Sequence, residues 1–348
     1  MKIAQVSPLY ESVPPKLYGG TERVVSYLTE ELVKQGHDVT LFASGDSVTR
    51  ARLEPIGEAA LRLNPNCLDA LAHHTILLDR VLSKAHGFDV IHFHTDYLHF
   101  LLTRSLPVAH VTTLHGRLDL PDLPALYREF RDVPLVSIAD HQRAPLAFAN
   151  WVSTVHHGLP EELYKFHPGP GKYLAFLGRI SEEKRLDRAI EIASRADMEL
   201  RIAAKVDKAD REFFEARIRP LLGHRGVEFL GEIGDHEKSD FLGNAHALLF
   251  PIDWPEPFGL VMIEAMACGT PVIAWNRGSV PEIVSHGETG FVVDSMDAAV
   301  AAVERVGQLS RERCRRAFEK RFSARRMARD YLAVYQAATA KSPRRSVA

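Results

Sequence analysis

The chain has 348 residues, of which 46% are hydrophobic and 25% charged, and this length and ordinary globular composition predict about two folded domains. Its 43 Lys and Arg residues are balanced by 45 Asp and Glu residues, and the net charge of −2 argues against a dedicated nucleic-acid binder, because such proteins carry a basic excess. The 3 scattered cysteines form no CxxC pair and the sequence has no long apolar run, so we expect a cytoplasmic protein without disulfides, a thiolate zinc site, a secretion signal or a membrane span.

Short β-rich runs alternate with helical patterns through the first half of the chain. This alternation predicts βαβ units and a parallel sheet that helices cover on both faces. We expect one helix over 140–149, opening with Asp140 as its N-cap. The other expected elements are a helix at 22–34 and strands at 2–6, 39–43, 90–93, 110–114, 135–139 and 151–155.

A segment rich in Pro and Gly at 166–171 interrupts the periodic pattern and marks the expected domain boundary. The alternation then resumes, which predicts a second doubly wound domain and a deep cleft between the carboxyl ends of the two sheets. We expect domains at 1–167 and 172–322, a hinge at 168–171, and a last helix within 323–348 that crosses back to the first domain before a frayed tail. The expected elements of the second domain are a helix at 185–195 and strands at 173–177, 200–204, 227–230, 247–251 and 271–274.

Eight arginines lie in the segment 310–329, which has a helical pattern. We favour a solvated helix with one buried face over a helix that contacts a membrane or nucleic acid. The expected buried face consists of Phe318, Phe322, Met327 and Tyr331.

The loop after the first expected strand ends in Gly19 and Gly20, just before a helix. Paired glycines let backbone amides approach a ligand closely, and the N-terminus of the helix favours an anion. The segment lacks the GxGxxG fingerprint, and a turn of this kind is structural more often than not. Its position at the carboxyl end of a strand makes it a candidate ligand contact.

Two cations, Arg179 and Lys184, follow the first strand of the second domain and precede a helix. Cations at a helix N-terminus oppose the helix dipole, so their presence requires an explanation. A diphosphate held between the Arg179 fork and the Lys184 ammonium would provide one. A surface ion-pair cluster with Glu182 and Glu183 explains the pair equally well.

The segment 255–269 is the most specific local pattern in the chain. A rigid Pro-Glu-Pro loop contains Glu256, and an apolar helix then begins at Gly259 and ends with Gly269 as its C′ residue. Glu264 lies among apolar residues of this helix, so its carboxylate needs a hydrogen-bonding partner if it is buried. The vicinal hydroxyls of a ligand would satisfy it.

The E-x7-E spacing of Glu256 and Glu264 within EPFGLVMIEAMACGTPVIA, together with Arg179 and Lys184, resembles the retaining GT-B glycosyltransferases of family four (glycosyl transferases group 1). The GGTERVV segment, the TLHG turn at 113–116, and the segments 278–284 and 287–290 resemble the family at matching places. The resemblance spans nearly the whole chain. It implies two Rossmann-like domains facing a central cleft, a nucleotide-diphosphate sugar as donor, and transfer of a hexosyl unit to an acceptor hydroxyl.

By this resemblance the second domain binds most of the donor. Arg179 and Lys184 would hold the diphosphate, Glu264 the ribose hydroxyls and Glu256 the transferred sugar. The amides of the helix N-terminus would meet sugar or phosphate, and Ile233 would lie near the base; these donor contacts are Phe258, Gly259, Leu260 and Ile233. Fixed cations aimed at the leaving diphosphate lower the barrier, and because they neutralise its charge the resemblance implies neither a metal nor another cofactor.

In the first domain, the resemblance places the Gly19 and Gly20 backbone near the diphosphate and His115 near the reacting carbon of the sugar. Two further histidines, His92 and His94, share one face of a strand, which suggests metal ligation, but no Cys or third His stands at a suitable spacing, so we favour histidines that line a polyol site. For His94 and Asp96, lining an acceptor pocket and a purely structural role are equally supported.

The function that the resemblance implies is retaining, metal-independent transfer from a nucleotide sugar, with UDP-sugars favoured. The acceptor is a carbohydrate, a glycolipid or a small molecule that the sequence does not identify, and weak peripheral contact with the inner face of a membrane remains open. A GT-B isomerase or phosphorylase is the nearest alternative, and a catalytically silent sugar-nucleotide scaffold is another. A glycoside hydrolase is disfavoured, because Glu264 lies within an apolar helix and no second exposed acid is indicated.

Overall fold

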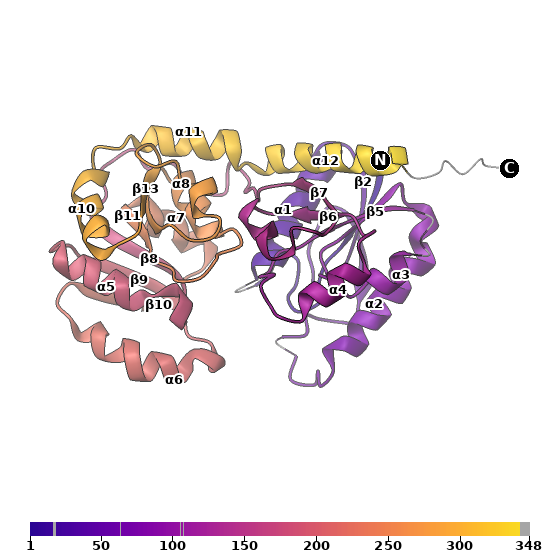
Figure 1. Ribbon diagram of the computed structural model, residues 1–348, viewed down its shortest axis with the longest axis horizontal. Coiled ribbons are helices and arrows are strands. Elements are labelled where there is room, and N and C mark those ends of the chain that lie inside the picture. Colours follow the sequence, from indigo (N-terminus) through magenta and orange to yellow (C-terminus); the bar gives the residue numbers. More distant parts are fainter. Residues whose placement is uncertain (17–18, 63, 105, 107, 342–348) are drawn as a thin grey trace. The chain divides into compact units, whose positions relative to one another are not determined.

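The structure is a computed structural model that describes residues 1–16, 19–62, 64–104, 106 and 108–341. The described chain divides into two compact units: the first comprises Met1–Pro160 with the chain from Ala324 onward, and the second comprises Glu161–Ser323. Each unit is built on a parallel β-sheet with helices packed on it (Figure 1). The predicted α/β class with two Rossmann-like domains is therefore confirmed.

The sheet of the first unit is parallel throughout. Its strands are β1 (Lys2–Val6), β2 (Asp38–Ser44), β3 (Arg52–Ile56), β4 (Val90–Phe93), β5 (Ala109–Thr113), β6 (Leu135–Ser137) and β7 (Trp151–Thr154). Among the described residues they pair in the order β3-β2-β1-β4-β5-β6-β7. The order reverses between β1 and β4, and the carboxyl ends at such a switch point are where ligands of open α/β sheets bind.

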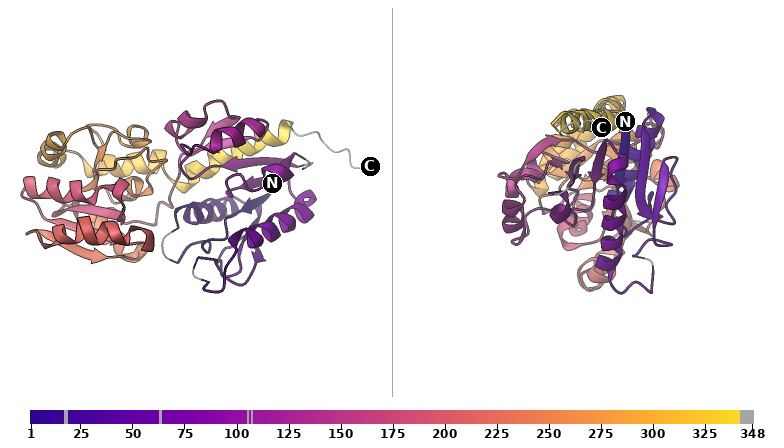
Figure 2. Two further views of the ribbon diagram at one scale, coloured as in Figure 1. Left: turned by 60° about the horizontal axis from the view of Figure 1, so that its bottom comes forward. Right: turned by 90° about the vertical axis from the view of Figure 1, so that its right-hand side faces the viewer.

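The helices of the first unit cover this sheet. They are α1 (Gly20–Lys34), α2 (Ala70–Lys84), α3 (Phe100–Thr103), α4 (Leu123–Glu129) and α12 (Ala324–Lys341), with short 3₁₀ turns at Ala85–Gly87 and His141–Leu146. The last helix, α12, packs against α1, β4 and β5 (Figure 2). Met327, Tyr331 and Tyr335 recur every four residues along it and are buried, so one face of α12 belongs to the core of this unit.

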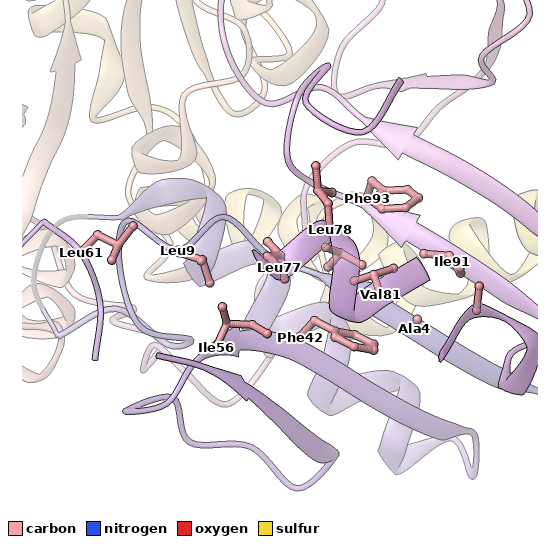
Figure 3. Packing of buried hydrophobic residues seen from close by; sticks show 12 residues of the cluster. Ala4, Leu9, Phe42, Ile56, Leu61, Leu77, Leu78, Val81, Ile91 and Phe93 are labelled. Carbon is pink, nitrogen blue, oxygen red and sulfur yellow. The ribbon is translucent and has the colours of Figure 1, made fainter. Parts of the chain in front are cut away.

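Helix α2 closes one part of this core. It begins where Asp69 accepts hydrogen bonds from Leu71 N at 2.9 Å and Ala72 N at 3.3 Å, which satisfies amides that the first helical turn leaves without partners. Its apolar face packs on β1, β2 and β4, where Leu77 and Val81 lie in one cluster with Phe42 (Figure 3). This packing fixes the strands whose ends carry the candidate site.

The second unit has a parallel sheet with the same kind of crossover (Figure 1). Its strands are β8 (Tyr173–Arg179), β9 (Leu200–Lys205), β10 (Val227–Gly231), β11 (Ala245–Phe250), β12 (Val272–Trp275) and β13 (Gly290–Val293). Within the described part of the chain their order is β10-β9-β8-β11-β12-β13. The carboxyl ends of β8 and β11 therefore form the switch point of this sheet.

Short helices connect the strands of the second unit. They are α5 (Leu186–Arg195), α6 (Arg211–Phe213), α7 (Asp235–Gly243), α8 (Leu260–Ala267), α9 (Val280–Ile283), α10 (Met296–Val306) and α11 (Arg311–Arg321), with 3₁₀ or π turns at Glu182–Lys184, Lys208–Asp210, Phe214–Ile218 and Arg219–Gly223. The strands predicted in both halves are present with ends shifted by at most two residues. Strands β3 and β13 were not predicted, and neither were helices α2, α3, α4, α6, α7, α9 and α10.

The chain passes between the units earlier than the sequence suggests. The segment 161–171 packs with the second unit, because His167 N donates to Cys268 O at 3.0 Å and Arg311 Nε donates to His167 O at 2.7 Å. A Cβ on Gly171 would lie 2.1 Å from the Ala245 backbone, so this glycine is needed for close packing. The two units therefore divide after Pro160, and not at the boundary that the sequence predicts at 168–171. The expected hinge at 168–171 stays a prediction.

The prediction of a helix over 140–149 is wrong. The structure has a 3₁₀ turn at His141–Leu146, and the side chain of Asp140 accepts from the Thr154 hydroxyl instead of capping the turn. Pro145 supplies no amide for an α-helical hydrogen bond. The side chain of Gln142 instead forms hydrogen bonds with the turn at Leu114 and Gly116.

The arginine-rich segment forms two helices, α11 and α12, instead of one. The predicted buried face is confirmed, since Phe318, Phe322, Met327 and Tyr331 are all buried. The solvated character is wrong for four of the arginines, because their guanidinium groups donate to backbone carbonyls of loops and helix ends; these are Arg311, Arg315, Arg321 and Arg326. In the described part of the chain, no helix combines the length and apolar character that crossing a membrane requires.

Candidate active site

The predicted site residues are divided between the two units, and all but Ile233 lie near the switch point of a sheet. The second unit holds Arg179, Lys184, Ile233, Glu256, Phe258, Gly259, Leu260 and Glu264, and the first unit holds Gly19, Gly20, His94, Asp96 and His115. In the second unit, Arg179 is the last residue of β8, and a tight turn carries Lys184 directly behind it. The loop after β11 joins this turn through Asp253 N, which donates to Glu183 O at 2.8 Å.

Lys184 and Glu256 form an ion pair at this switch point. The Lys184 ammonium donates to Glu256 Oε2, and the Trp254 indole donates to the same oxygen at 3.0 Å. The ammonium also lies 4.9 Å from the ring centroid of Trp254 and 5.5 Å from that of Phe250, within range of cation–π attraction. The side chains are 18% and 11% exposed, so the pair is largely but not completely shielded from water.

Arg179 is held by carboxylates of its own surroundings. Its Nη2 donates to Glu183 Oε1 at 2.7 Å, and its Nε lies 3.3 Å from Asp210 Oδ2. Burial alone would raise the pKa of Glu183, but hydrogen bonds from the backbone, Ser181 and Arg179 outweigh it and hold the pKa below its ordinary value. Arg179 thus pairs with Glu183, as the ion-pair alternative predicts, whereas Lys184 pairs with Glu256 and not with Glu182, and diphosphate binding by the two cations stays a prediction.

The loop that carries Glu256 is braced by residues that the sequence analysis assigned only by resemblance. Ser279 N donates to Glu256 O at 3.0 Å, and the Ser279 hydroxyl donates to Phe258 O at 2.9 Å. Gly278 has φ +56°, and a Cβ there would lie 2.4 Å from Glu256 N and O. Only glycine combines that backbone with so close an approach, so the turn at 278–279 sets the position of Glu256.

Helix α8 begins directly after this loop, at Gly259. Gly259 has φ +79°, and Phe258 before it is buried against Phe322 with ring centroids 6.2 Å apart. Leu260 is half-buried at the first helical position. The amides of this first turn face the switch point of an α/β sheet, where they suit an anion or a polar ligand.

Glu264 is 4% exposed within α8, and two side chains that the sequence analysis missed hold it. The Tyr164 hydroxyl donates to Glu264 Oε1 at 3.1 Å, and Lys238 Nζ lies 3.4 Å from the same oxygen. Among the described residues, no side chain or backbone group donates to Oε2. A ligand hydroxyl is therefore not required to satisfy Glu264, but one carboxylate oxygen remains available to accept from it.

Ile233 lies apart from these residues. It is half-buried in the loop between β10 and α7, and β9 separates β10 from β8 in the sheet. Gly234 N next to it donates to Glu237 Oε2 at 2.9 Å, which orders the entry to α7. The structure does not bring the Ile233 side chain together with the ion pair of Lys184 and Glu256.

In the first unit, Gly19 and Gly20 open helix α1. Gly19 is buried and packs closely, since an added Cβ would lie 2.8 Å from the Pro15 side chain, while Gly20 is exposed. Behind them Glu22 is buried, and burial raises its pKa to about 7. Gly19 thus has a packing reason, as the structural interpretation holds, and the glycine pair also leaves backbone amides at the N-terminus of α1.

His92 of β4 and His94 directly after this strand belong to a buried hydrogen-bond network. His92 Nδ1 lies 2.7 Å from the Tyr335 hydroxyl, and its Nε2 lies 2.7 Å from Thr113 Oγ1. His94 Nδ1 lies 2.8 Å from His115 Nε2, and His94 Nε2 lies 2.9 Å from Gln5 Oε1. Burial lowers the pKa of His92 and of His94 well below its usual value, so both rings are neutral at physiological pH.

His115 lies on the turn after β5, and the turn is held from two sides. Gln142 Nε2 donates to Leu114 O at 3.0 Å and to Gly116 O at 2.9 Å. Gln142, which the sequence analysis placed in a helix, therefore braces this turn. The His157 ring stacks on His115 at 5.3 Å between centroids. Burial lowers the pKa of His115 to about 3, and its Nδ1 is buried without a hydrogen-bond partner among the described residues.

The structure brings His94 and His115 together but not Asp96. Asp96 is exposed in the turn after β4 with φ +48°, and no hydrogen bond in the described chain links it to the histidines. In the residues that the structure covers, no cluster of three or more His, Cys, Asp or Glu side chains is arranged to hold a metal ion.

Two family descriptions match the chain, and known proteins resemble it along nearly its whole length. Glycosyltransferase Family 4 matches residues 18–141, and Glycosyl transferases group 1 matches residues 164–325. A phosphatidyl-myo-inositol mannosyltransferase of Mycolicibacterium smegmatis is 27% identical, with 93% of this chain and 89% of that protein covered.

Solved structures share the fold. Sucrose-phosphate synthase of Thermosynechococcus elongatus has a TM-score of 0.80 at 20% identity, covering 98% of this chain and 100% of that one. HepE of Anabaena, crystallised with UDP and glucose, has a TM-score of 0.73 at 18% identity, covering 97% and 100%. These similarities show the GT-B architecture.

Proposed function

Because the chain belongs to the glycosyltransferases that combine these two matched domains, we propose that it is a retaining enzyme that moves a hexosyl unit from a nucleotide-diphosphate sugar to an acceptor hydroxyl. The observation that carries the proposal is the ion pair of Lys184 with Glu256, placed at the switch point of a parallel sheet and only partly exposed. A charged pair in that position is suited to exchange one partner for a ligand.

The donor diphosphate is proposed to bind Lys184 and Arg179. A diphosphate carries more negative charge than the carboxylate of Glu256, so it can replace Glu256 as the partner of the Lys184 ammonium. The guanidinium group of Arg179, at the end of β8, then binds the same diphosphate. Once Lys184 turns to phosphate, Glu256 is free to accept hydrogen bonds from hydroxyls of the transferred sugar. Arg179 and Lys184 thereby stabilise the charge that develops on the leaving diphosphate.

The nucleoside is proposed to lie near α8. The free Oε2 of Glu264 would accept from a ribose hydroxyl, while Tyr164 and Lys238 hold the other oxygen in place. The amides that follow Phe258 and Gly259 would contact sugar or phosphate. Backbone near Ile233 is assigned to the base, and UDP is the favoured nucleotide.

In the first unit, His115 is proposed to contact the donor sugar and the Gly19 and Gly20 backbone the diphosphate. The Nδ1 atom of His115 has no hydrogen-bond partner among the described residues, and we assign it as the acceptor for a sugar hydroxyl. His94 and Asp96 are assigned to the acceptor side. In retaining transfer the leaving phosphate draws the proton from the acceptor hydroxyl on the same face of the sugar, so no protein nucleophile is required.

The known relatives support a nucleotide-sugar donor. The HepE structure contains UDP and glucose, which supports the preference for UDP, and the mannosyltransferase acts on phosphatidyl-myo-inositol by its name. For this chain the proposed acceptor class is a carbohydrate, a glycolipid or a small molecule with a free hydroxyl, with peripheral contact at the inner face of a membrane if it is a glycolipid.

The experiment that tests the proposal is a transfer assay with UDP-, GDP- and ADP-linked glucose, mannose and N-acetylglucosamine against a panel of acceptors. We expect one donor to yield a glycoside with the anomeric configuration of the donor, as measured by NMR. Epimerised donor or a sugar phosphate as the product would instead identify an isomerase or a phosphorylase. No turnover of any donor, with folded protein, would contradict the proposal.

Metal dependence is tested in the same assay. Because two cations, Arg179 and Lys184, are placed to neutralise the diphosphate, we expect excess EDTA to leave the initial rate unchanged within about twofold. A complete loss of rate that Mg²⁺ restores would contradict the metal-independent mechanism.

A further inference from the structure

A chain of hydrogen bonds runs through the interior of the first unit from the last helix to His115. Gln5 Nε2 donates to the Tyr335 hydroxyl at 3.0 Å, and Gln5 Oε1 lies 2.9 Å from His94 Nε2. The other nitrogen of that ring, Nδ1, lies 2.8 Å from His115 Nε2. Gln5 and Tyr335 are 0% exposed and His94 is 2% exposed, so water does not compete for these bonds.

The amide of Gln5 gives this chain a direction. Since its nitrogen donates to Tyr335, its oxygen must accept a proton-bearing nitrogen, which is His94 Nε2. A neutral imidazole carries one N–H, so His94 Nδ1 bears a lone pair and accepts from His115 Nε2. His115 Nδ1 is then left with a lone pair, and this atom is the buried one without a partner among the described residues.

The Tyr335 hydroxyl anchors the other end. It accepts from Gln5 and has one proton of its own, which it can donate to His92 Nδ1 at 2.7 Å. His92 Nε2 then donates to Thr113 Oγ1 at 2.7 Å, and the Thr113 hydroxyl is bonded to Tyr331 at 3.0 Å. The Tyr335 hydroxyl and the ring N–H groups of His92, His94 and His115 thus each meet an acceptor.

We infer that Tyr335 and Gln5 are positioning residues, which act through His94 to hold His115 in the tautomer whose Nδ1 accepts a hydrogen bond from a sugar hydroxyl. The inference rests on the proposed function for the identity of that hydroxyl. It assigns helix α12 a part in the reaction that packing alone would not require, because Tyr335 is contributed by the last helix and Gln5 by the first strand.

The tautomer is measured without any substrate, by NMR of the full chain labelled with ¹⁵N-histidine, with the His115 signals identified from their loss in His115→Ala. We expect Nε2 of His115 to carry the proton in the wild type. In Tyr335→Phe the Gln5 amide loses its fixed acceptor and can turn over, so we expect a mixture of the two tautomers. A proton on Nδ1 in the wild type, or an unchanged spectrum in Tyr335→Phe, would overturn the inference.

Kinetics give the second readout. We expect Tyr335→Phe and Gln5→Leu to lower kcat about tenfold with KM for the donor within about twofold, the size of effect that loss of a buried hydrogen bond produces. In the His115→Ala background, Tyr335→Phe should lower kcat no further. A further drop of the same size there would show that Tyr335 does not act through His115.

The matched control is Tyr331→Phe. Tyr331 lies on the same helix and is fully buried, but its hydroxyl ends on Thr113 and not on Gln5. We expect kcat to change by less than about twofold. An equal loss in both variants would assign the effect to packing of α12 and overturn the inference. If the wild type transfers no sugar at all, the proposed function fails, and the NMR result still decides the tautomer.

Discussion

The two units place opposite kinds of polar chemistry at the switch points of similar sheets. In the second unit the groups are charged and partly exposed, with Lys184 on Glu256 and Arg179 on Glu183. In the first unit they are neutral and buried, since His94 is 2% exposed and burial lowers the pKa of His115 to about 3. The charged group can exchange partners, whereas the neutral group is fixed by its own hydrogen bonds.

This difference separates two tasks of the proposed reaction. Binding and stabilising a diphosphate needs cations that can leave their carboxylates, and partial exposure keeps the cost of that exchange low. Orienting a sugar next to the reacting carbon needs a donor or acceptor that does not move, and a buried network supplies it. Changes in the two units should therefore have different effects.

The largest expected effect is in the charged group. We expect Lys184→Ala to lower kcat by about 10²- to 10⁴-fold, because a preorganised charge on the leaving group is lost and Glu256 keeps no ammonium partner. The matched control is Arg201→Ala, a cation at the amino end of β9 that pairs with Glu199. Initial-rate kinetics compare the two variants with the wild type. Equal rates for Lys184→Ala and wild type would refute the proposed role of Lys184.

Glu264 sharpens the comparison within the second unit. We expect Glu264→Ala to raise KM for the donor about 10- to 100-fold while kcat stays within about threefold, because a bond to ribose is made equally in the ground and transition states. Steady-state kinetics separate the two parameters. A loss confined to kcat would contradict the assignment to ribose.

We expect low pH to destabilise the first unit, which holds the buried neutral histidines, more than it destabilises the second unit. Burial lowers the pKa of eight histidines of the first unit, so below about pH 6.5 the unfolded chain binds protons that the folded unit does not; these are His37, His74, His92, His94, His99, His110, His115 and His157. Their stability contribution is complete above that pH and is lost as the pH falls toward the folded values. Glu22 acts in the opposite direction, since its pKa is raised to about 7, but it is one group.

We therefore expect the free energy of opening β4 and β5 to fall by at least about 2 kcal/mol between pH 7.5 and 5.5. Hydrogen exchange of peptides from these strands measures it, with peptides from β11 and β12 as the internal reference. Equal behaviour of both units would show that the network is not the acid-sensitive part.

The smallest expected effect concerns the turn that braces Glu256. We expect Gly278→Ala to lower the free energy of unfolding by about 1–3 kcal/mol and to slow turnover, because a Cβ would lie 2.4 Å from the Glu256 backbone. Gly287→Ala is the control, since it also has positive φ but no atom within 4 Å of the added Cβ. Denaturant unfolding with activity assays compares them. Equal losses of activity in both variants would remove the bracing role of Gly278.

The second-unit site was predictable because its residues lie in short contiguous motifs next to strand ends. Arg179 and Lys184 follow β8 within a few residues, and Glu256 and Glu264 are fixed by one loop and the helix after it. Hydrophobic periodicity gave the sheets for the same reason: neighbouring residues carry the signal. The sequence pattern did not predict that Lys184 pairs with Glu256, because Lys184 follows β8 and Glu256 lies in the loop after β11.

The first-unit network was not predictable, because its members meet only in the folded chain. Gln5 lies on the first strand, His94 directly follows the fourth strand of the chain, and Tyr335 lies on the last helix; each alone is an ordinary core residue. Gln142 illustrates the same limit, since its bonds to Leu114 and Gly116 replace the expected helix at 140–149. Local pattern carries no information on such contacts.

The central claim is that Lys184 and Arg179 bind the diphosphate of a nucleotide sugar. It is tested most directly by calorimetric titration of wild type, Lys184→Ala and Arg201→Ala with UDP, GDP, ADP and their sugar conjugates in the presence of EDTA. We predict saturable binding of one nucleotide family to wild type and Arg201→Ala, weakened at least about tenfold in Lys184→Ala. Absence of binding by every nucleotide, or equal affinity in Lys184→Ala and wild type, would contradict the claim.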